Sequence, residues 1–263
     1  MLVSSSSELT ALTGITRADL YNSFISNFEE ISLISDFFRG LLSQQGLPSF
    51  SHLVEIGSGP GRILSTFRSF SRRVTGVDFD KEYCLAAQKI VNEENLSEVR
   101  IVCENFLKYT PDIPIDCLAI INGAFYYSES SEYLRELLAC CYKKLSSGGV
   151  LVLEGANLLY FIKNYGKGFS FNTVKEIKNL SVERQISHVI DTFNCHWIHK
   201  DTYQISGRIN CTYEESYRFL IVTLEHILSI LTSIGFEILS VDKGWKSLVG
   251  EDSSSKLLIT ARR

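Results

Sequence analysis

The stretch HLVEIGSGPGRILSTFRSFSRRVTGVDFD, residues 52–80, decides the fold of this chain. An apolar run breaks into the glycine-rich turn GSGPG at residues 57–61, and a helix-compatible segment follows at residues 62–70. A second apolar run then ends in Asp78. Strand, glycine-rich turn, helix and strand in this order predict one βαβ unit of a parallel sheet.

The spacing of the glycines separates two classes of cofactor. Gly57, Gly59 and Gly61 carry no Cβ, so the backbone can turn sharply and approach a ligand closely. A dinucleotide fingerprint, G-x-G-x-x-G, would require a further glycine at the position that Arg62 occupies. The spacing therefore disfavours a nicotinamide-dependent oxidoreductase. A tight turn that binds no ligand is the alternative.

The turn is preceded by Glu55, and Asp78 ends the next strand at the carboxyl edge of the sheet, where open α/β folds bind ligands. This pattern resembles motif I of the class I S-adenosylmethionine (SAM)-dependent methyltransferases. The resemblance implies that SAM is the cofactor, that the turn lies along its methionine part and that Asp78 holds its ribose. The cofactor-binding residues that we expect are Tyr21, Glu55, Gly57, Ser58, Gly59, Gly61, Asp78, Phe79, Asn105, Phe106 and Asn122.

The adenine side of the site is expected after a strand at residues 99–103. Carried over by position, Asn105 would contact the adenine amino group, and the backbone N–H of Phe106 would meet a ring nitrogen. Glu104 and Asn105 stand where the family usually has glycine and aspartate. An amide oxygen still accepts a hydrogen bond, so Asn105 fits this role.

A continuous apolar strand at residues 116–121 leads into a loop with three aromatic residues. In the family, this loop lies beside the sulfonium of SAM and the acceptor. Aromatic ring faces favour a nearby positive charge, although ordinary packing explains the same residues. We therefore expect Tyr127 as a candidate catalytic residue and Tyr126 as a candidate substrate-binding residue.

A helix is expected at residues 133–145, ended by Gly148 in the left-handed conformation, with a fifth strand at residues 150–154. The residues after that strand lie at the carboxyl edge of the sheet. Asn157 and Tyr160 are therefore further substrate-side candidates.

The segment at residues 158–215 is matched to the family only in position. Period-two alternation at residues 185–191, 193–199 and 203–212 predicts an antiparallel hairpin or small sheet. Four of the five histidines fall in or after this segment, and a histidine near neutral pKa is a natural general base. His196 and His199 are the candidates, and no carboxylate or cysteine completes a metal site with them.

The ends of the chain complete the expected fold. Helical spacing at residues 17–42 predicts two helices with a break near residues 27–32, where Tyr21 either closes over SAM or packs on the helix face. Another helix at residues 224–233 precedes strands at residues 236–241 and 256–261.

We expect a Rossmann-like α/β fold with a seven-stranded, mostly parallel sheet and helices on both faces. The resemblance implies strand order 3-2-1-4-5-7-6 with the last strand antiparallel. The expected parts are an N-terminal helical cap (residues 1–48), the SAM-binding core (49–157), an antiparallel β insert after strand 5 that forms a substrate lid (158–215) and the C-terminal part of the core sheet (216–263).

Composition limits the setting in which this chain works. Its 263 residues and 45% hydrophobic content suffice for one well-buried domain, and a net charge of −4 disfavours a nucleic-acid partner. No membrane span or signal peptide is visible, and seven cysteines without a CxxC pair favour reduced thiols in the cytoplasm. We expect a monomer or homodimer.

The function that follows is SAM-dependent methyl transfer by SN2 displacement to an oxygen or nitrogen atom of a small molecule. Such an enzyme mainly aligns acceptor and methyl group and excludes water. The alternatives are a methyltransferase acting on tRNA or protein, and a SAM-binding regulatory module without catalysis.

Overall fold

The computed structural model describes residues 1–25, 28–165, 170–245 and 255–263. The chain divides into two compact units. The seven-stranded unit comprises Asn27–Leu158 and Val222–Arg263, and the five-stranded unit comprises Met1–Ser26 and Leu159–Ile221.

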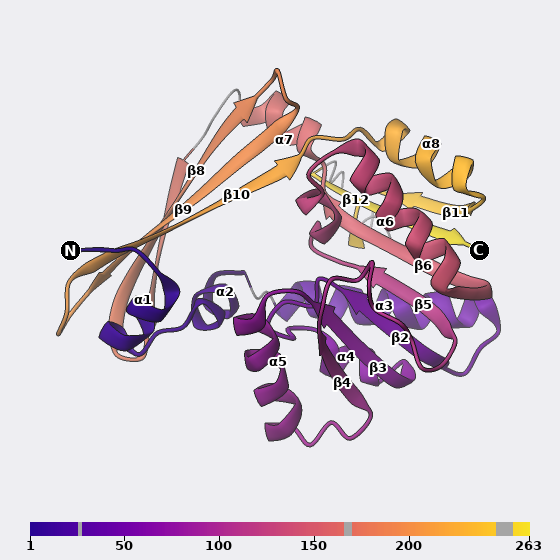
Figure 1. Cartoon of the computed structure of the whole chain (residues 1–263), viewed down its shortest axis with the longest axis horizontal. Coiled ribbons are helices and arrows are strands. Elements are labelled where there is room, and N and C mark those ends of the chain that lie inside the picture. The colour runs from indigo at the N-terminus through magenta and orange to yellow at the C-terminus, as the bar shows by residue number, and fades with distance from the viewer. Residues whose placement is uncertain (26–27, 166–169, 246–254) are drawn as a thin grey trace. The chain divides into compact units, whose positions relative to one another are not determined.

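The sheet of the seven-stranded unit has the order β11-β12-β6-β5-β2-β3-β4 (Figure 1). β4, β3, β2, β5 and β6 are parallel, whereas β12 runs antiparallel to both β6 and β11. The predicted order and the antiparallel last strand are thus confirmed. The strands are β2 (Phe50–Ile56), β3 (Ser71–Asp78), β4 (Val99–Cys103), β5 (Ile115–Ile120), β6 (Leu145–Ala156), β11 (Glu237–Asp242) and β12 (Lys256–Arg262).

Helices pack on both faces of this sheet because its central strands are apolar on both sides. β5 is buried from Cys117 to Ile120, as expected for a parallel strand inside an α/β fold. One buried cluster joins Leu53 and Val74 of the sheet to Phe38 and Phe67 of two helices. The helices are α3 (Phe28–Gln45), α4 (Leu64–Arg68), α5 (Lys81–Glu93), α6 (Ser131–Lys144), α8 (Leu224–Ile234) and the 3-10 helix η1 (Ala124–Tyr127).

One local expectation in this unit is wrong. α6 ends at Lys144 and β6 begins at Leu145, so Gly148, at φ +76°, lies inside β6 and does not cap the helix. The two helices predicted within residues 17–42 are present, at Arg17–Ile25 and Phe28–Gln45. The predicted break near residues 27–32 is narrower than expected, because α3 is continuous from Phe28, and residues 26 and 27 lie outside the described residues.

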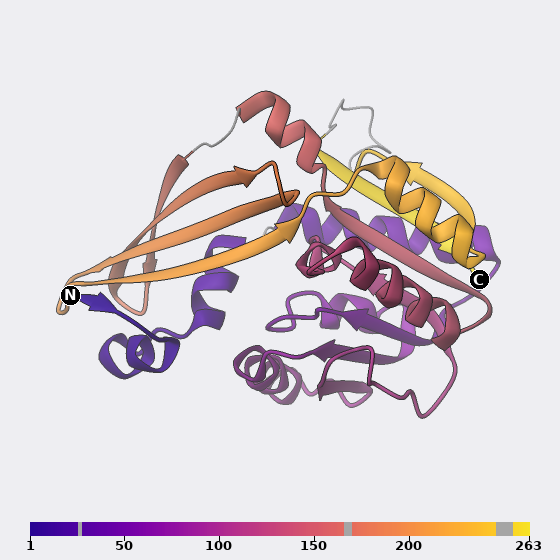
Figure 2. The same cartoon turned by 45° about the horizontal axis from the view of Figure 1, so that its top comes forward.

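The sheet of the five-stranded unit has the order β1-β10-β9-β8-β7. β7 to β10 are antiparallel neighbours, and β1 adds to β10 in parallel (Figure 2). The elements are β1 (Leu2–Val3), α1 (Ser6–Thr13), α2 (Arg17–Ile25), α7 (Leu158–Tyr165), β7 (Ser170–Ile177), β8 (Leu180–Asp191), β9 (His196–Ser206) and β10 (Cys211–Leu220).

The predicted bounds of these strands are partly wrong. The predicted segment at residues 193–199 starts in the turn before β9, where Cys195 has φ +55°. The predicted segment at residues 203–212 crosses the turn between β9 and β10, where Gly207 has φ +140°. Alternation carries the period of a strand but not the position of its turns. β7 was not expected at all.

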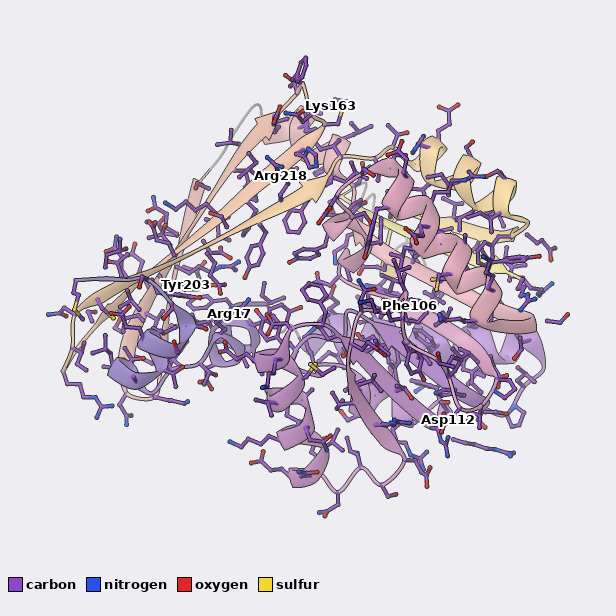
Figure 3. The ribbon with its side chains drawn as sticks, viewed as in Figure 1. Arg17, Phe106, Asp112, Lys163, Tyr203 and Arg218 are labelled. Atoms are coloured by element: carbon purple, nitrogen blue, oxygen red, sulfur yellow. The ribbon has the colours of Figure 1, made fainter. Side chains whose placement is uncertain are left out.

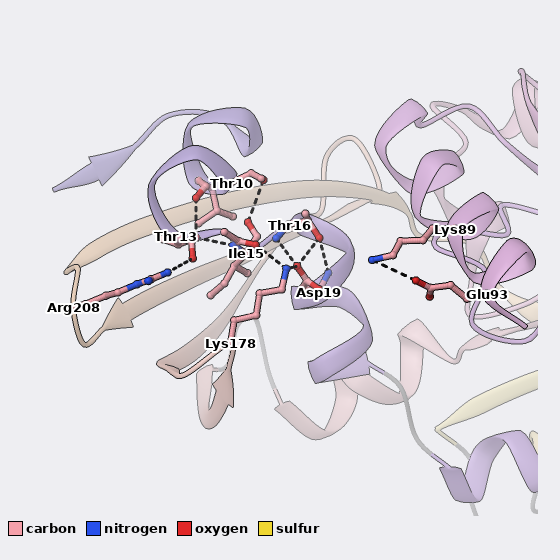
Figure 4. A network of polar contacts seen from close by, with 11 residues as sticks. Thr10, Thr13, Ile15, Thr16, Asp19, Lys89, Glu93, Lys178 and Arg208 are labelled. Atoms are coloured by element: carbon pink, nitrogen blue, oxygen red, sulfur yellow. Dashed lines mark hydrogen bonds and ion pairs between the residues drawn. The ribbon is translucent and has the colours of Figure 1, made fainter.

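The helices of the five-stranded unit share a buried cluster with its sheet that includes Leu9, Leu20 and Tyr203. Polar contacts around Asp19 fix α2 to the same sheet (Figure 4). The Asp19 carboxylate accepts hydrogen bonds from the backbone N–H of Thr16 at 2.7 Å and from Lys178 Nζ at 2.6 Å. The first bond caps the start of α2, and the second ties it to the turn between β7 and β8.

Within the described residues, no helix has both the length and the hydropathy that a bilayer span requires.

Candidate functional site

A pocket of about 100 Å³ lies at the carboxyl edge of the seven-stranded sheet. Segments that follow β2, β3, β4 and β5 all contribute to it. Six residues predicted for the site line it: Gly57, Asp78, Phe79, Asn105, Phe106 and Tyr127. The structure therefore brings together the ends of four strands that are far apart along the chain.

The glycine-rich turn forms one wall of the pocket and needs its glycines. Gly57, Gly59 and Gly61 have φ values of +70°, +53° and +86°, in the region that L side chains rarely adopt. A Cβ at Gly57 would lie 2.6 Å from the Cβ of Ala124. The turn after β2 and the segment after β5 are therefore in contact with no room for a side chain between them.

Asp78 lies at the end of β3 and holds the turn in place. Its Oδ2 accepts a hydrogen bond from the N–H of Gly59 at 2.8 Å, and its Oδ1 accepts one from the N–H of Asp80 at 2.8 Å. Burial raises the pKa of Asp78, and these hydrogen bonds oppose part of that effect. A half-buried carboxylate at this edge can accept bonds from ligand hydroxyls.

Glu55 precedes the turn and is only 4% exposed. No described residue forms a hydrogen bond with Glu55 Oε2 or with the Oγ of buried Ser58. Burial raises the pKa of Glu55 well above its ordinary range, Arg62 opposes this shift and Asp78 adds to it. Two orphaned polar atoms close to Gly57, which has no room for a Cβ, fit a ligand that carries hydrogen-bond donors, as the methionine end of SAM does.

The segment after β4 forms the opposite side of the pocket. Asn105 Oδ1 accepts a hydrogen bond from the N–H of Leu107 at 2.8 Å, and its Nδ2 donates to the hydroxyl of Tyr133 at 3.2 Å. The amide oxygen predicted for the adenine contact thus already has a backbone partner. Phe106, labelled in Figure 3, is buried beside Tyr109 with 6.1 Å between ring centroids.

The turn after β5 is left-handed at both Asn122 and Gly123, with φ values of +54° and +71°. The N–H of Asn122 donates to Glu154 Oε2 at 2.7 Å, and the N–H of Gly123 donates to the backbone carbonyl of Glu154 at 2.9 Å. Tyr126 is buried, and its hydroxyl donates to the carbonyl of Ala156 at 2.6 Å. Burial also raises the pKa of Tyr126. Tyr127 is 46% exposed and faces the pocket.

The other predicted site residues lie outside this pocket. Asn157 belongs to the seven-stranded unit, and its N–H donates to the carbonyl of Ser255 at 2.7 Å. Tyr21, Tyr160, His196 and His199 belong to the five-stranded unit. Their roles in binding or catalysis stay predictions.

The two candidate bases have different surroundings. His196 is buried, and neither of its ring nitrogens has a hydrogen-bond partner among the described residues. His199 Nε2 lies 3.1 Å from Asp201 Oδ2, and Arg184 binds the same carboxylate with two nitrogens at 2.9 and 3.0 Å. Burial would raise the pKa of Asp201, but His199 and Arg184 outweigh it and lower that pKa.

A third histidine, His188, was not among the candidates. It lies opposite His199 in the sheet, with 3.3 Å between their Nδ1 atoms, and its Nδ1 also accepts a hydrogen bond from the indole of Trp197. Burial, and to a lesser degree the electrostatic interactions with His199 and Arg184, lower the pKa of His188 to about 3. Only cross-strand pairing reveals this environment, so the sequence pattern could not indicate it.

The pocket also contains residues that sequence reasoning missed. They are mainly apolar or small side chains: Ala124, Ser128, Tyr133 and Leu137. Their contribution depends on where the segment after β5 turns, and no motif marked them.

The comparisons with known proteins point in one direction. Residues 53–149 match the family described as a methyltransferase domain. No curated protein matches the sequence.

Solved structures match nearly the whole chain. One is a SAM-dependent methyltransferase from Clostridium acetobutylicum, with 14% identity, a TM-score of 0.77 and coverage of 93% of this chain and 96% of that one. Another is an amino pentose methyltransferase of calicheamicin biosynthesis from Micromonospora echinaspora, solved with SAM, with 17% identity, a TM-score of 0.72 and coverage of 100% and 99%.

A third is a sugar N-methyltransferase from a Streptoalloteichus species, with 15% identity, a TM-score of 0.72 and coverage of 93% and 92%. At these identities the likeness shows the fold. Residues 53–149 therefore form a methyltransferase domain, and the chain has the class I fold of the SAM-dependent methyltransferases.

Proposed function

We propose that this methyltransferase moves the methyl group of SAM to an oxygen or nitrogen atom of a small-molecule acceptor by SN2 displacement. The observation that carries the proposal is the pocket in which Gly57, Asp78, Asn105 and Tyr127 meet at the ends of four strands. Ligands of open α/β sheets bind at this edge. SAM, when bound, supplies a methyl group on a positively charged sulfur with a good leaving group.

The residues of the chain would then divide the work of binding. The Asp78 carboxylate accepts from ribose hydroxyls, and the turn at Gly57 and Gly59 contacts the methionine part. Glu55 and Ser58 offer orphaned polar atoms beside that turn. Asn105 and Phe106 lie at the adenine side, and Tyr127 presents a partly exposed ring. Excluding water and fixing the approach of the acceptor supply most of the rate.

The acceptor is the finer part of the proposal. Two of the structures with this fold are an amino pentose methyltransferase and a sugar N-methyltransferase, which supports a small polar acceptor. We propose an amino sugar as the first class to test. Asn157 and Tyr160 are the candidates for contacts with it, and His196 or His199 for removing its proton. Tyr126 would act through the shape of the turn, because its hydroxyl is engaged by Ala156.

Location and assembly belong to the same proposal. Four of the seven cysteines are buried as free thiols, which fits a protein of the reducing cytoplasm. A monomer or homodimer is expected, and a net charge of −4 gives no electrostatic attraction for nucleic acid.

Methyl-labelled SAM tests the proposal directly. The protein is incubated with labelled SAM and, separately, with amino sugars, the matched sugars that carry hydroxyl in place of amine, tRNA and a denatured protein mixture. Label on a sugar supports the proposal, and the matched pair tells nitrogen from oxygen. Label on tRNA or protein favours the macromolecular alternative. SAM binding with no transfer to any acceptor favours a regulatory module.

A further inference from the structure

Four side chains of alternating charge, here called the charge chain, contact one another in the seven-stranded unit: Arg62, Glu30, Lys256 and Glu154. Arg62 Nη1 lies 3.0 Å from Glu30 Oε2, and Glu30 Oε1 lies 2.7 Å from Lys256 Nζ. Lys256 Nζ also lies 2.7 Å from Glu154 Oε1. The charge chain ends at Glu154, whose Oε2 accepts the hydrogen bond from the N–H of Asn122 at 2.7 Å. Its members come from α3, the segment after the glycine-rich turn, β12 and β6.

Three of these four side chains are largely removed from water, and Lys256 is 33% exposed. The side chain of Glu154 is 0% exposed, and that of Arg62 is 6% exposed. Burial would lower the pKa of Lys256, but Glu154 and Glu30 raise it. Burial would raise the pKa of Glu30, but Lys256 and Arg62 lower it. Screening by solvent is weak for such groups, so each charge strongly fixes the position of the next.

The charge chain joins two walls of the proposed SAM pocket. Arg62 directly follows the glycine-rich turn, and Asn122 begins the turn after β5. These walls meet at Gly57 and Ala124, where a single added Cβ would lie 2.6 Å from its neighbour. Packing this close leaves little freedom for one wall to move without the other.

We propose that Lys256 and Glu154 are positioning residues that set the spacing of the two walls and thereby the affinity for SAM. The inference rests on the proposed function, because it concerns the same pocket. Lys256 neutralises Glu154, whose other oxygen holds the left-handed turn at Asn122. Through Glu30, Lys256 also connects that turn to Arg62 on the opposite wall.

A comparison of variants separates positioning from mere stabilisation. Lys256→Met leaves the buried Glu154 carboxylate without a cation, which destabilises the fold and by itself proves little. The double variant Glu154→Gln/Lys256→Met removes both charges and keeps an amide oxygen that can accept from the N–H of Asn122. The Arg62–Glu30 pair stays intact in it. Lys89→Met is the matched control, because Lys89 forms an exposed pair with Glu93 at 3.7 Å (Figure 4).

The measurements are the thermal midpoint of unfolding and the dissociation constant for SAM by calorimetry. We expect the double variant to recover most of the midpoint lost in Lys256→Met, while its affinity for SAM stays about tenfold below that of the wild type. Lys89→Met should match the wild type in both. A double variant that binds SAM as the wild type does would overturn the inference alone. A wild-type protein that binds no SAM overturns the proposed function, and the inference with it.

Discussion

The two units place their buried ionisable groups in different parts of a sheet. In the seven-stranded unit, Glu55 and Glu154 lie near the ends of parallel strands, where the polypeptide turns over an otherwise apolar core. In the five-stranded unit, Arg184 and Asp201 lie inside long antiparallel strands. Parallel strands that are buried on both faces favour polar chemistry at their ends, whereas an antiparallel strand can carry it along one face.

This difference explains which buried polar sites can be predicted from a sequence motif. Strand ends are marked in a sequence by glycines and acids, but a face of an antiparallel sheet is marked only by alternation. Two of these buried groups are in opposite situations. Glu55 has an orphaned oxygen, whereas the Asp201 carboxylate is bound by Arg184 and His199.

The largest effect is expected at the turn that ends β2. Gly57→Ala brings a Cβ to within 2.6 Å of the Cβ of Ala124 at φ +70°, so the wall of the pocket must shift. We expect the affinity for SAM to fall by about a hundredfold, as small displacements in such sites do. Calorimetric titration with SAM measures it.

Gly148→Ala is the matched control for the backbone strain. Gly148 has φ +76°, but an added Cβ would meet no atom within 4 Å. This variant should lose about 1 kcal/mol of stability and keep its affinity for SAM. Equal affinities in the two variants would show that the contact at Gly57 does not matter for binding.

Each unit has its own tryptophan, so its pH response can be followed separately. Trp245 lies in the seven-stranded unit and Trp197 in the five-stranded unit, and both are buried. They are the only two in the chain. Trp197→Phe therefore leaves a reporter of the first unit, and Trp245→Phe leaves a reporter of the second.

The second prediction concerns Glu55, whose pKa is raised in the folded state. The folded state then binds more protons than the unfolded state, so stability falls as pH rises from the unfolded pKa through the folded one. Glu55→Gln should remove that fall and gain roughly 1 to 3 kcal/mol above the folded pKa. Urea unfolding followed by Trp245 between mildly acidic and mildly alkaline pH checks this. If the stabilities of the variant and the parent changed with pH in parallel, the prediction for Glu55 would be contradicted.

The third and smallest effect is a loss of stability as pH falls, which is opposite in direction to the effect of Glu55. The pKa of His188 is lowered to about 3 in the folded state, so the unfolded state binds more protons and stability is lost as pH falls below the ordinary histidine range. His188→Gln keeps an acceptor for the Trp197 indole but does not titrate. Because His188 is partly exposed, we expect the variant to lose about 1 kcal/mol less on acidification.

Fluorescence of Trp197 during urea unfolding measures this response, and exposed His226→Gln serves as the control. If stability fell as steeply on acidification in His188→Gln as in the parent, the His188 imidazole would not be responsible for the loss.

The sequence predicted the seven-stranded unit well because its strong signals are local. The glycines at 57, 59 and 61 and the acid at 78 lie within one βαβ unit, and apolar β5 leaves little choice of position. The charge chain could not be predicted in the same way. Lys256 is separated by 226 residues from Glu30 and by 102 from Glu154, so only the folded sheet brings them together.

The five-stranded unit was predicted less well for a related reason. Its alternating strands indicated an antiparallel arrangement, but the turn at residues 192–195 contains no glycine or proline, and the predicted strand at 203–212 ran through Gly207, which marks the next turn. His188 acquires its unusual environment from His199 and Trp197 across the strand. Cross-strand pairs depend on register, and a shift by one residue would send each side chain to the other face.

Calorimetric titration of the wild-type protein and of Asp78→Asn with SAM, S-adenosylhomocysteine and NAD tests the central claim most directly. We predict dissociation constants on the order of micromolar for both sulfur ligands and no binding of NAD. Asp78→Asn, which keeps one acceptor oxygen but loses the charge, should bind SAM about tenfold more weakly. Binding of NAD, or no binding of either sulfur ligand, would contradict the assignment of this pocket to SAM.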